Sequence, residues 1–122
     1  MGLLDAWSRR ATERREGRVE FLGEQSGEIE DTLKRELLLE FVTRPDIQTA
    51  YLARIGFQPQ GEGSVALCIA SARPDDKSLV LRVGEIFRRR FARKAALDIL
   101  FLTPEQESDV ARVCQPFYRR AT

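Results

Sequence analysis

The stretch VALCIA, Val65–Ala70, decides the fold, because six consecutive apolar residues leave no polar face that could meet solvent. A strand of this composition is typical of the inside of a sheet that is covered on both faces. Upstream, Ile47–Phe57 alternates, and its β-branched and aromatic residues predict a second strand. Ile47, Thr49, Tyr51, Ala53, Ile55 and Phe57 are expected to share one face of it.

Farther out, short apolar runs predict strands over residues 19–22 and 97–102. Apolar residues at helical spacing predict helices over residues 27–42, 74–91 and 104–114. Ser26 is the expected N-cap of the first of these helices, and Thr103 with Gln106 has the spacing of a capping box for the last.

The resulting order is the split βαβ arrangement, so we predict an α+β fold with a ferredoxin-like βαββαβ core and a mixed four-stranded sheet. The expected strand order is fourth, first, third, second, which places Ile47–Phe57 at an edge. Terminal helices complete the chain. Because the second and fourth strands are apolar on both faces, we expect these helices, a second chain, or both to cover the second face.

The spacing of apolar residues predicts a separate amphipathic helix over residues 1–17, and one domain follows it over residues 18–122. Leu3, Leu4 and Trp7 form its apolar stripe and are candidate interaction residues. The stripe is thin, so this helix needs a surface to pack on.

The net charge is only +1, but it is unevenly distributed. Residues 24–62 carry eight Asp/Glu and four Lys/Arg, a net of −4, whereas residues 63–96 carry three Asp/Glu and eight Lys/Arg, a net of +5. The strongest basic cluster is a candidate anion or partner patch, formed by Arg88, Arg89, Arg90, Arg93 and Lys94. The alternative is that these cations complement the dipole of a helix C-terminus. The near-neutral total charge argues against nucleic acid.

The chain contains no histidine, which excludes His-based acid–base catalysis, the usual triads and most zinc sites. Cys68 and Cys114 stand alone in apolar segments, so we expect two buried thiols and a cytoplasmic location. No apolar run is long enough for a membrane span. We therefore predict no metal, no cofactor and no catalytic residues.

Asp98 is the one carboxylate in an otherwise apolar strand. Two positions are open to it: solvent at a strand edge, which we favour, or a partly buried site with an arginine. A small enzymatic or anion-binding site would need a hollow that gathers Asp98, arginines and Tyr51 or Tyr118.

An edge strand with unpaired backbone groups invites pairing, and opposite charges can match across a two-fold axis. We therefore expect a homodimer through Ile47–Phe57, with the N-terminal helix acting as an intramolecular cover in the competing arrangement.

Several segments together resemble the C-terminal domain of the bacterial SseB family, the serine-sensitivity-enhancing proteins. Those segments are Phe21–Gln25, Pro45–Ala53, Val65–Ala70, Leu97–Leu102 and Pro116–Tyr118. The resemblance covers residues 19–119 and implies no established activity, cofactor or catalytic residue.

Together these observations predict a non-enzymatic protein-interaction module whose protein partner is unidentified. The alternatives are an immunity or chaperone-like protein for a toxin or secreted partner, and a small anion-binding or enzymatic domain around Asp98.

Overall fold

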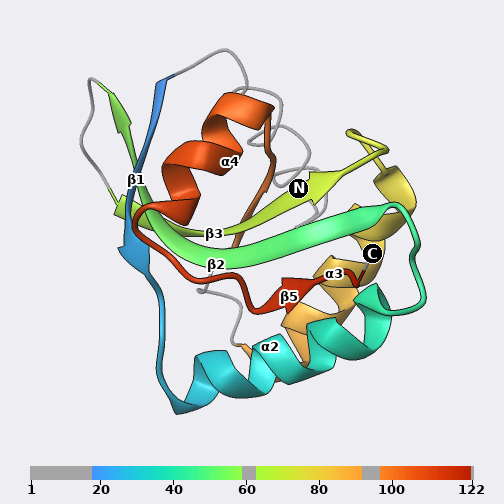
Figure 1. Cartoon of the computed structure of the whole chain (residues 1–122). Coiled ribbons are helices and arrows are strands. Elements are labelled where there is room, and N and C mark those ends of the chain that lie inside the picture. Colours follow the sequence, from blue (N-terminus) through green and yellow to red (C-terminus); the bar gives the residue numbers. More distant parts are fainter. Residues whose placement is uncertain (1–17, 59–62, 92–96, 122) are drawn as a thin grey trace.

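The computed structural model describes residues 18–58, 63–91 and 97–121. They form an α+β domain with a mixed five-stranded sheet, seen in Figure 1. The elements are β1 (Arg18–Glu24), α2 (Glu28–Phe41), β2 (Ile47–Gln58), β3 (Gly63–Ser71), α3 (Lys77–Arg90), β4 (Asp98–Phe101), α4 (Pro104–Ala111) and β5 (Tyr118–Arg119).

The strand order differs from the ferredoxin-like prediction. The sheet runs β1-β2-β3-β4, with β5 also beside β2, and the β3–β4 pair is parallel while the others are antiparallel. The predicted order of fourth, first, third, second is therefore wrong, and the sheet has five described strands instead of four.

The direction of α2 explains this difference. In a ferredoxin-like unit the first helix runs back along the sheet, so that the next strand is parallel to the first. Here α2 packs on one face of the sheet and runs antiparallel to the first half of β2 (Figure 1), and β2 then continues antiparallel to β1. The lengths agree: seven strand residues and fourteen helical residues span about 44 Å, and the twelve residues of β2 span about 40 Å.

Strand β2 is consequently internal, and its prediction as an edge strand is wrong. One side pairs with β3 along most of its length. The other side pairs with β1 at residues 53–58 and with β5 at Thr49 and Ala50. The predicted homodimer thus loses its proposed contact through β2, and the dimer itself stays a prediction.

The larger core lies between the sheet and the helices α2 and α3. Leu33, Leu37 and Phe41 of α2 pack there with residues of α3 and with alternate residues of β2, β3 and β4. The chain end also joins this core, because the Phe41 ring lies 5.8 Å edge-on from Tyr118 and 6.1 Å from Phe117. Phe117 and Tyr118 thus fold back onto the larger core.

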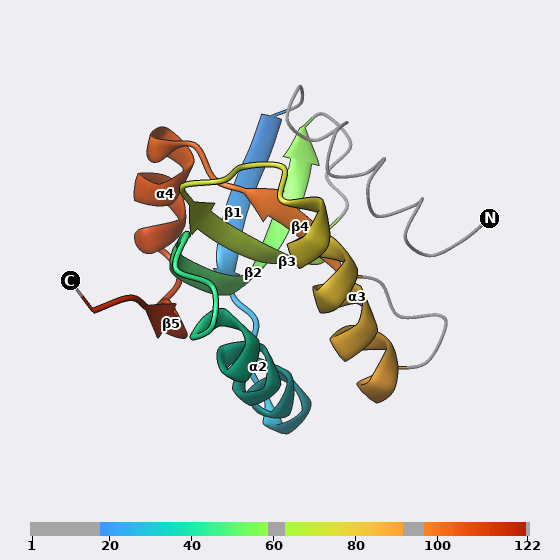
Figure 2. The same cartoon turned by 90° about the vertical axis from the view of Figure 1, so that its right-hand side faces the viewer.

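A second, smaller core lies on the opposite face of the sheet, beneath α4. Figure 2 shows α4 separated by the sheet from α3. Val110 and Cys114 pack there on Tyr51, Ala53 and further strand residues. The expectation that a terminal helix covers the second face is therefore confirmed for the C-terminal helix, whereas residues 1–17 lie outside the described part of the chain.

The prediction that Ile47 shares a face of β2 with Tyr51 is wrong, because a bulge interrupts the alternation of the strand. Tyr51, Ala53 and Ile55 share the smaller core as expected, but Ile47 belongs to the larger one. The pairing register with β3 shifts between Ile47 and Thr49, and a one-residue shift moves a side chain to the other face.

Local signals decide where the helices begin. Thr103 and Gln106 form the predicted capping box of α4, and Asp76 caps α3 by accepting a hydrogen bond from the Leu79 amide. For α2 the expected cap is wrong: the N-cap is Gly27 instead of Ser26, and no side chain caps that end. Among the described residues, none of the helices has both the length and the apolar character needed to cross a membrane.

Candidate functional site

The arginine cluster lies partly in the structure. Arg88 and Arg89 are exposed in the last turn of α3, and Arg90 is its final residue. Arg93 and Lys94 lie outside the described residues. The placed members thus occupy a helix C-terminus, where cations complement the helix dipole.

The candidate interaction residues Leu3, Leu4 and Trp7 also lie outside the described residues. The binding role assigned to them from the sequence stays a prediction. Any site built from the structure therefore rests on the sheet and on the helices α2, α3 and α4.

Asp98 is buried, with 2% of its surface exposed, so the favoured solvent-facing position is wrong. Its Oδ2 accepts a 2.7 Å hydrogen bond from the Ser64 hydroxyl of the neighbouring strand. Asp98 starts β4 opposite Ala66, on the face that carries Leu100. The carboxylate therefore belongs to the smaller core, where a serine supplies part of its hydrogen bonding.

The two tyrosines are divided by the sheet. Tyr51 packs in the smaller core and Tyr118 in the larger one. Burial raises the pKa of Tyr51, and the nearby Glu107 carboxylate raises it further. Glu107 also accepts a 2.8 Å hydrogen bond from Thr49. The structure thus places Asp98 and Tyr51 on one face and Tyr118 on the other.

Both thiols are buried and free, as predicted. Burial raises the pKa of Cys68 well above its ordinary value. Burial also raises the pKa of Cys114, to about 11, and its Sγ lies 3.6 Å from the Leu52 carbonyl oxygen. Neither thiol is a thiolate near neutral pH, so neither is a ready nucleophile.

A cavity opens between the start of α2 and the end of α3, on the face of the larger core. Its volume is about 230 Å³, and it is open on one side. The walls are almost entirely apolar and are formed by Leu33, Leu52, Val65, Phe87, Phe91 and Leu97. The rings of Phe87 and Phe91 are stacked 4.4 Å apart and form an aromatic wall.

Two polar side chains line the same cavity. The Gln25 amide donates a 2.7 Å hydrogen bond to Oε2 of Glu30. Gln25 follows β1, where its backbone amide donates to the Leu52 carbonyl, and Glu30 lies in the first turn of α2. The cavity therefore combines an apolar interior with one carboxylate and one amide.

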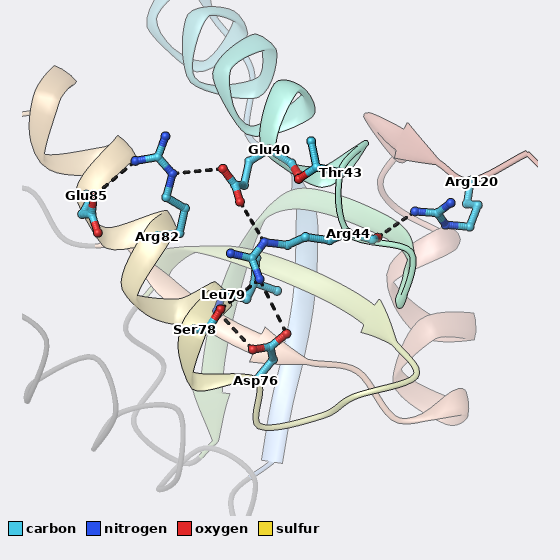
Figure 3. A network of polar contacts seen from close by, with 9 residues as sticks. All are labelled: Glu40, Thr43, Arg44, Asp76, Ser78, Leu79, Arg82, Glu85 and Arg120. Carbon is cyan, nitrogen blue, oxygen red and sulfur yellow. Dashed lines mark hydrogen bonds and ion pairs between the residues drawn. The ribbon is translucent and has the colours of Figure 1, made fainter.

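A network of polar contacts holds the other ends of the two helices together (Figure 3). Glu40 of α2 accepts 2.9 Å hydrogen bonds from Nε of Arg44 and from Nε of Arg82 on α3. Arg44 also donates to the Ser78 hydroxyl at 3.1 Å and lies 3.8 Å from Asp76.

The same network binds Arg120 near the C-terminus and lowers the pKa of Glu40. Arg120 donates to the backbone carbonyls of Arg44 and Ile47. Burial works against the charge of Glu40, but the hydrogen bonds from Arg82 and Arg44 outweigh it and hold the pKa of Glu40 below its ordinary value. The ion pair between Glu40 and Arg82 thus connects α2 and α3 at this end, and the cavity separates the two helices at the other end.

Sequence reasoning missed both the cavity and the network. The helical spacing of Phe87 and Phe91 is typical of core residues, and both pack in or against the larger core, but such spacing does not reveal a cavity beside them. Glu40 and Arg82 lie 42 residues apart, and no local pattern joins them.

A comparison of the chain with curated proteins gives no significant match, and neither does a comparison with solved structures. A family model described as the SseB protein C-terminal domain matches residues 21–120. That match begins inside β1 and ends just after β5, so it includes every element described above except the first residues of β1. The chain therefore belongs to the SseB protein C-terminal domain family.

Proposed function

We propose that this chain is a non-enzymatic protein-interaction module that binds its partner through the cavity between α2 and α3. The observation that carries the proposal is the cavity itself, about 230 Å³ of apolar space open to one side. Protein interiors are close-packed, and each Å³ of void costs roughly 24 cal/mol. An enclosed void of this volume would cost about 5.5 kcal/mol, which is an upper limit for an open one.

An apolar side chain from a partner would recover that free energy on binding. Hot spots of protein interfaces are large side chains that fill a desolvated pocket, surrounded by contacts that exclude water. The exposed apolar residues Leu39 and Val42 lie at the opposite end of α2 and do not line the cavity.

The polar groups of the cavity support binding more than catalysis. Gln25 and Glu30 are hydrogen-bonded to each other. The chain has no histidine, and the buried thiols lie among the strands of the other core. Asp98 also faces that other core and does not line the cavity.

The test compares a variant that fills the cavity with a control variant that makes the same exchange on the exposed surface. Val65→Phe adds a ring to the cavity wall, while Val42→Phe makes the same exchange at an exposed position directly after α2. Wild type and both variants are immobilised and exposed to an extract of the native host, and retained proteins are identified by mass spectrometry. We expect a partner that wild type and Val42→Phe retain and that folded Val65→Phe loses.

Equal retention by all three proteins would refute the cavity as the binding site. Circular dichroism checks that Val65→Phe is folded. Val65→Leu, which adds a single methylene group, serves as the milder variant if the larger one unfolds. Light scattering of the same samples tests the predicted homodimer.

A further inference from the structure

The cavity is chemically asymmetric, and this asymmetry restricts what can occupy it. Its interior is apolar, and the polar side chains Gln25 and Glu30 belong to the β1–α2 side. Glu30 is the one ionisable residue among the described residues that line the cavity. Among the described lining residues, a ligand that fills the interior therefore meets one negative charge, that of Glu30, and no positive one.

The carboxylate of Glu30 accepts one hydrogen bond and lies against the backbone of Gly27. Oε2 accepts the 2.7 Å hydrogen bond from Gln25. Oε1 occupies the space beside Gly27, 2.5 Å from where a Cβ atom would stand. Gly27 has a φ of 149°, a conformation that L side chains rarely adopt, so glycine both permits the turn and leaves room for the carboxylate.

Two further acidic residues accompany Glu30 in the sequence of α2. Glu28 and Asp31 lie with Glu30 in the first turn of α2. The nearest cation in the sequence, Lys34, pairs with Glu24 at 3.4 Å. The exposed Arg88 of α3 is not among the residues that line the cavity.

We infer, on the basis of the function proposed above, that the partner presents an aromatic or large aliphatic side chain directly next to a lysine or arginine. The apolar side chain fills the cavity, and the cation pairs with the Glu30 carboxylate. A cavity of about 150 Å³ holds a benzene ring, so 230 Å³ holds a ring with a short linker to a peptide backbone. Phe87 and Phe91 supply aromatic contacts for that ring.

The charge preference is testable with small probes. The probes share a phenyl ring but not their remaining apolar groups; they are acetyl-phenylalanyl-lysine amide, acetyl-phenylalanyl-glutamine amide and acetyl-phenylalanyl-glutamate amide, with phenethylamine, which carries the ring and a cation without a peptide backbone. Each is titrated into the full chain, and amide chemical shifts of the cavity residues give the dissociation constants. A half-exposed ion pair is worth up to about 1 kcal/mol, so the lysine peptide should bind about fivefold more tightly than the glutamate peptide.

Glu30→Gln is the matched variant, because it keeps the shape and removes the charge. It should bring the lysine and glutamate peptides close to the affinity of the glutamine peptide. Val65→Phe should abolish the binding of all three. This combination of results would support the inference.

Three results would refute the inference, and they differ in whether they also refute the proposed function. Equal binding of the lysine and glutamate peptides to wild type, still blocked by Val65→Phe, refutes the charge preference and leaves the interaction module standing. Tighter binding of phenethylamine than of the lysine peptide would assign the cavity to a small amine instead of a protein segment. No binding of any probe, or binding that Val65→Phe leaves unchanged, refutes the cavity as a binding site and the proposed function with it.

Discussion

Replacing Glu40 by glutamine tests whether the charged network fastens α2 to α3. The carboxylate receives two 2.9 Å hydrogen bonds, from Arg44 in the segment after α2 and from Arg82 on α3, while its side chain is 18% exposed. Glutamine keeps the shape but presents an uncharged group to two guanidinium groups. Glu85→Gln is the control, because Glu85 contacts only the Arg82 end of this network in the described residues and is 52% exposed.

The expected loss follows from the geometry. Hydrogen bonds to charged groups contribute roughly 1.5–3 kcal/mol each when buried, and solvent screening brings exposed pairs below 1 kcal/mol. Glu40 lies between these limits, so Glu40→Gln should lower the free energy of unfolding by about 1.5 kcal/mol at pH 7. With about 2.1 cal/mol/K per residue for 122 residues, the melting temperature should fall by about 6 °C. Glu85→Gln should stay within about 0.5 kcal/mol of wild type.

The pH dependence has a definite sign. The pKa of Glu40 in the folded chain lies below its ordinary value of 4.5, so the carboxylate stabilises the fold above that pH. As pH falls below 4.5 and through the folded pKa, wild-type Glu40 takes up a proton and its advantage over glutamine disappears. Urea unfolding at pH 7, 5 and 3, followed by circular dichroism, measures the difference. A difference below 0.5 kcal/mol at pH 7, or one of equal size at pH 3, would refute this account of the network.

Three further predictions concern local structure. Gly27→Ala should lower the free energy of unfolding by more than about 1 kcal/mol, because alanine at this position has an unfavourable positive φ and a Cβ atom that clashes with Glu30. Adding Glu30→Ala to the same chain should restore part of this loss, as measured by urea unfolding. If nothing is restored, the clash does not contribute to the loss. Thr103→Ala removes the capping box and should cost about 1 kcal/mol, seen as faster hydrogen exchange in α4, whereas unchanged exchange would argue against the cap. Cys68 and Cys114 should react with a thiol reagent at pH 8 only after denaturant is added, and rapid labelling of the native chain would contradict their burial and raised pKa values.

The element order and most helix starts could be predicted because their causes are local. Thr103 and Gln106 satisfy each other within one turn, and Asp76 caps α3 three residues before the amide that it binds. The apolar run Val65–Ala70 forms part of β3, which is internal to the sheet, and the alternating run Ile47–Phe57 falls within β2. The family resemblance stated from short segments is confirmed by the match over residues 21–120.

Prediction failed where the cause lies far along the chain. The burial of Asp98 depends on Ser64, which lies 34 residues earlier in the sequence. The Ser64 hydroxyl donates a hydrogen bond to the carboxylate and so lowers the free-energy cost of burying it. The face of Ile47 depends on a bulge against β3, and alternation in a single strand cannot reveal a bulge.

By itself, then, the sequence determined the described helices and the strands β1 to β4, but not the short strand β5, and it indicated that both faces of the sheet must be covered and which family the chain resembles. These follow from hydrophobic periodicity and capping, which act over a few residues. Only the tertiary structure decided that α2 runs antiparallel to the first half of β2, that β2 is therefore internal, and that a cavity lies between α2 and α3. The physical reason is that helix direction and packing gaps depend on contacts between segments such as Glu40 and Arg82, which no local pattern records.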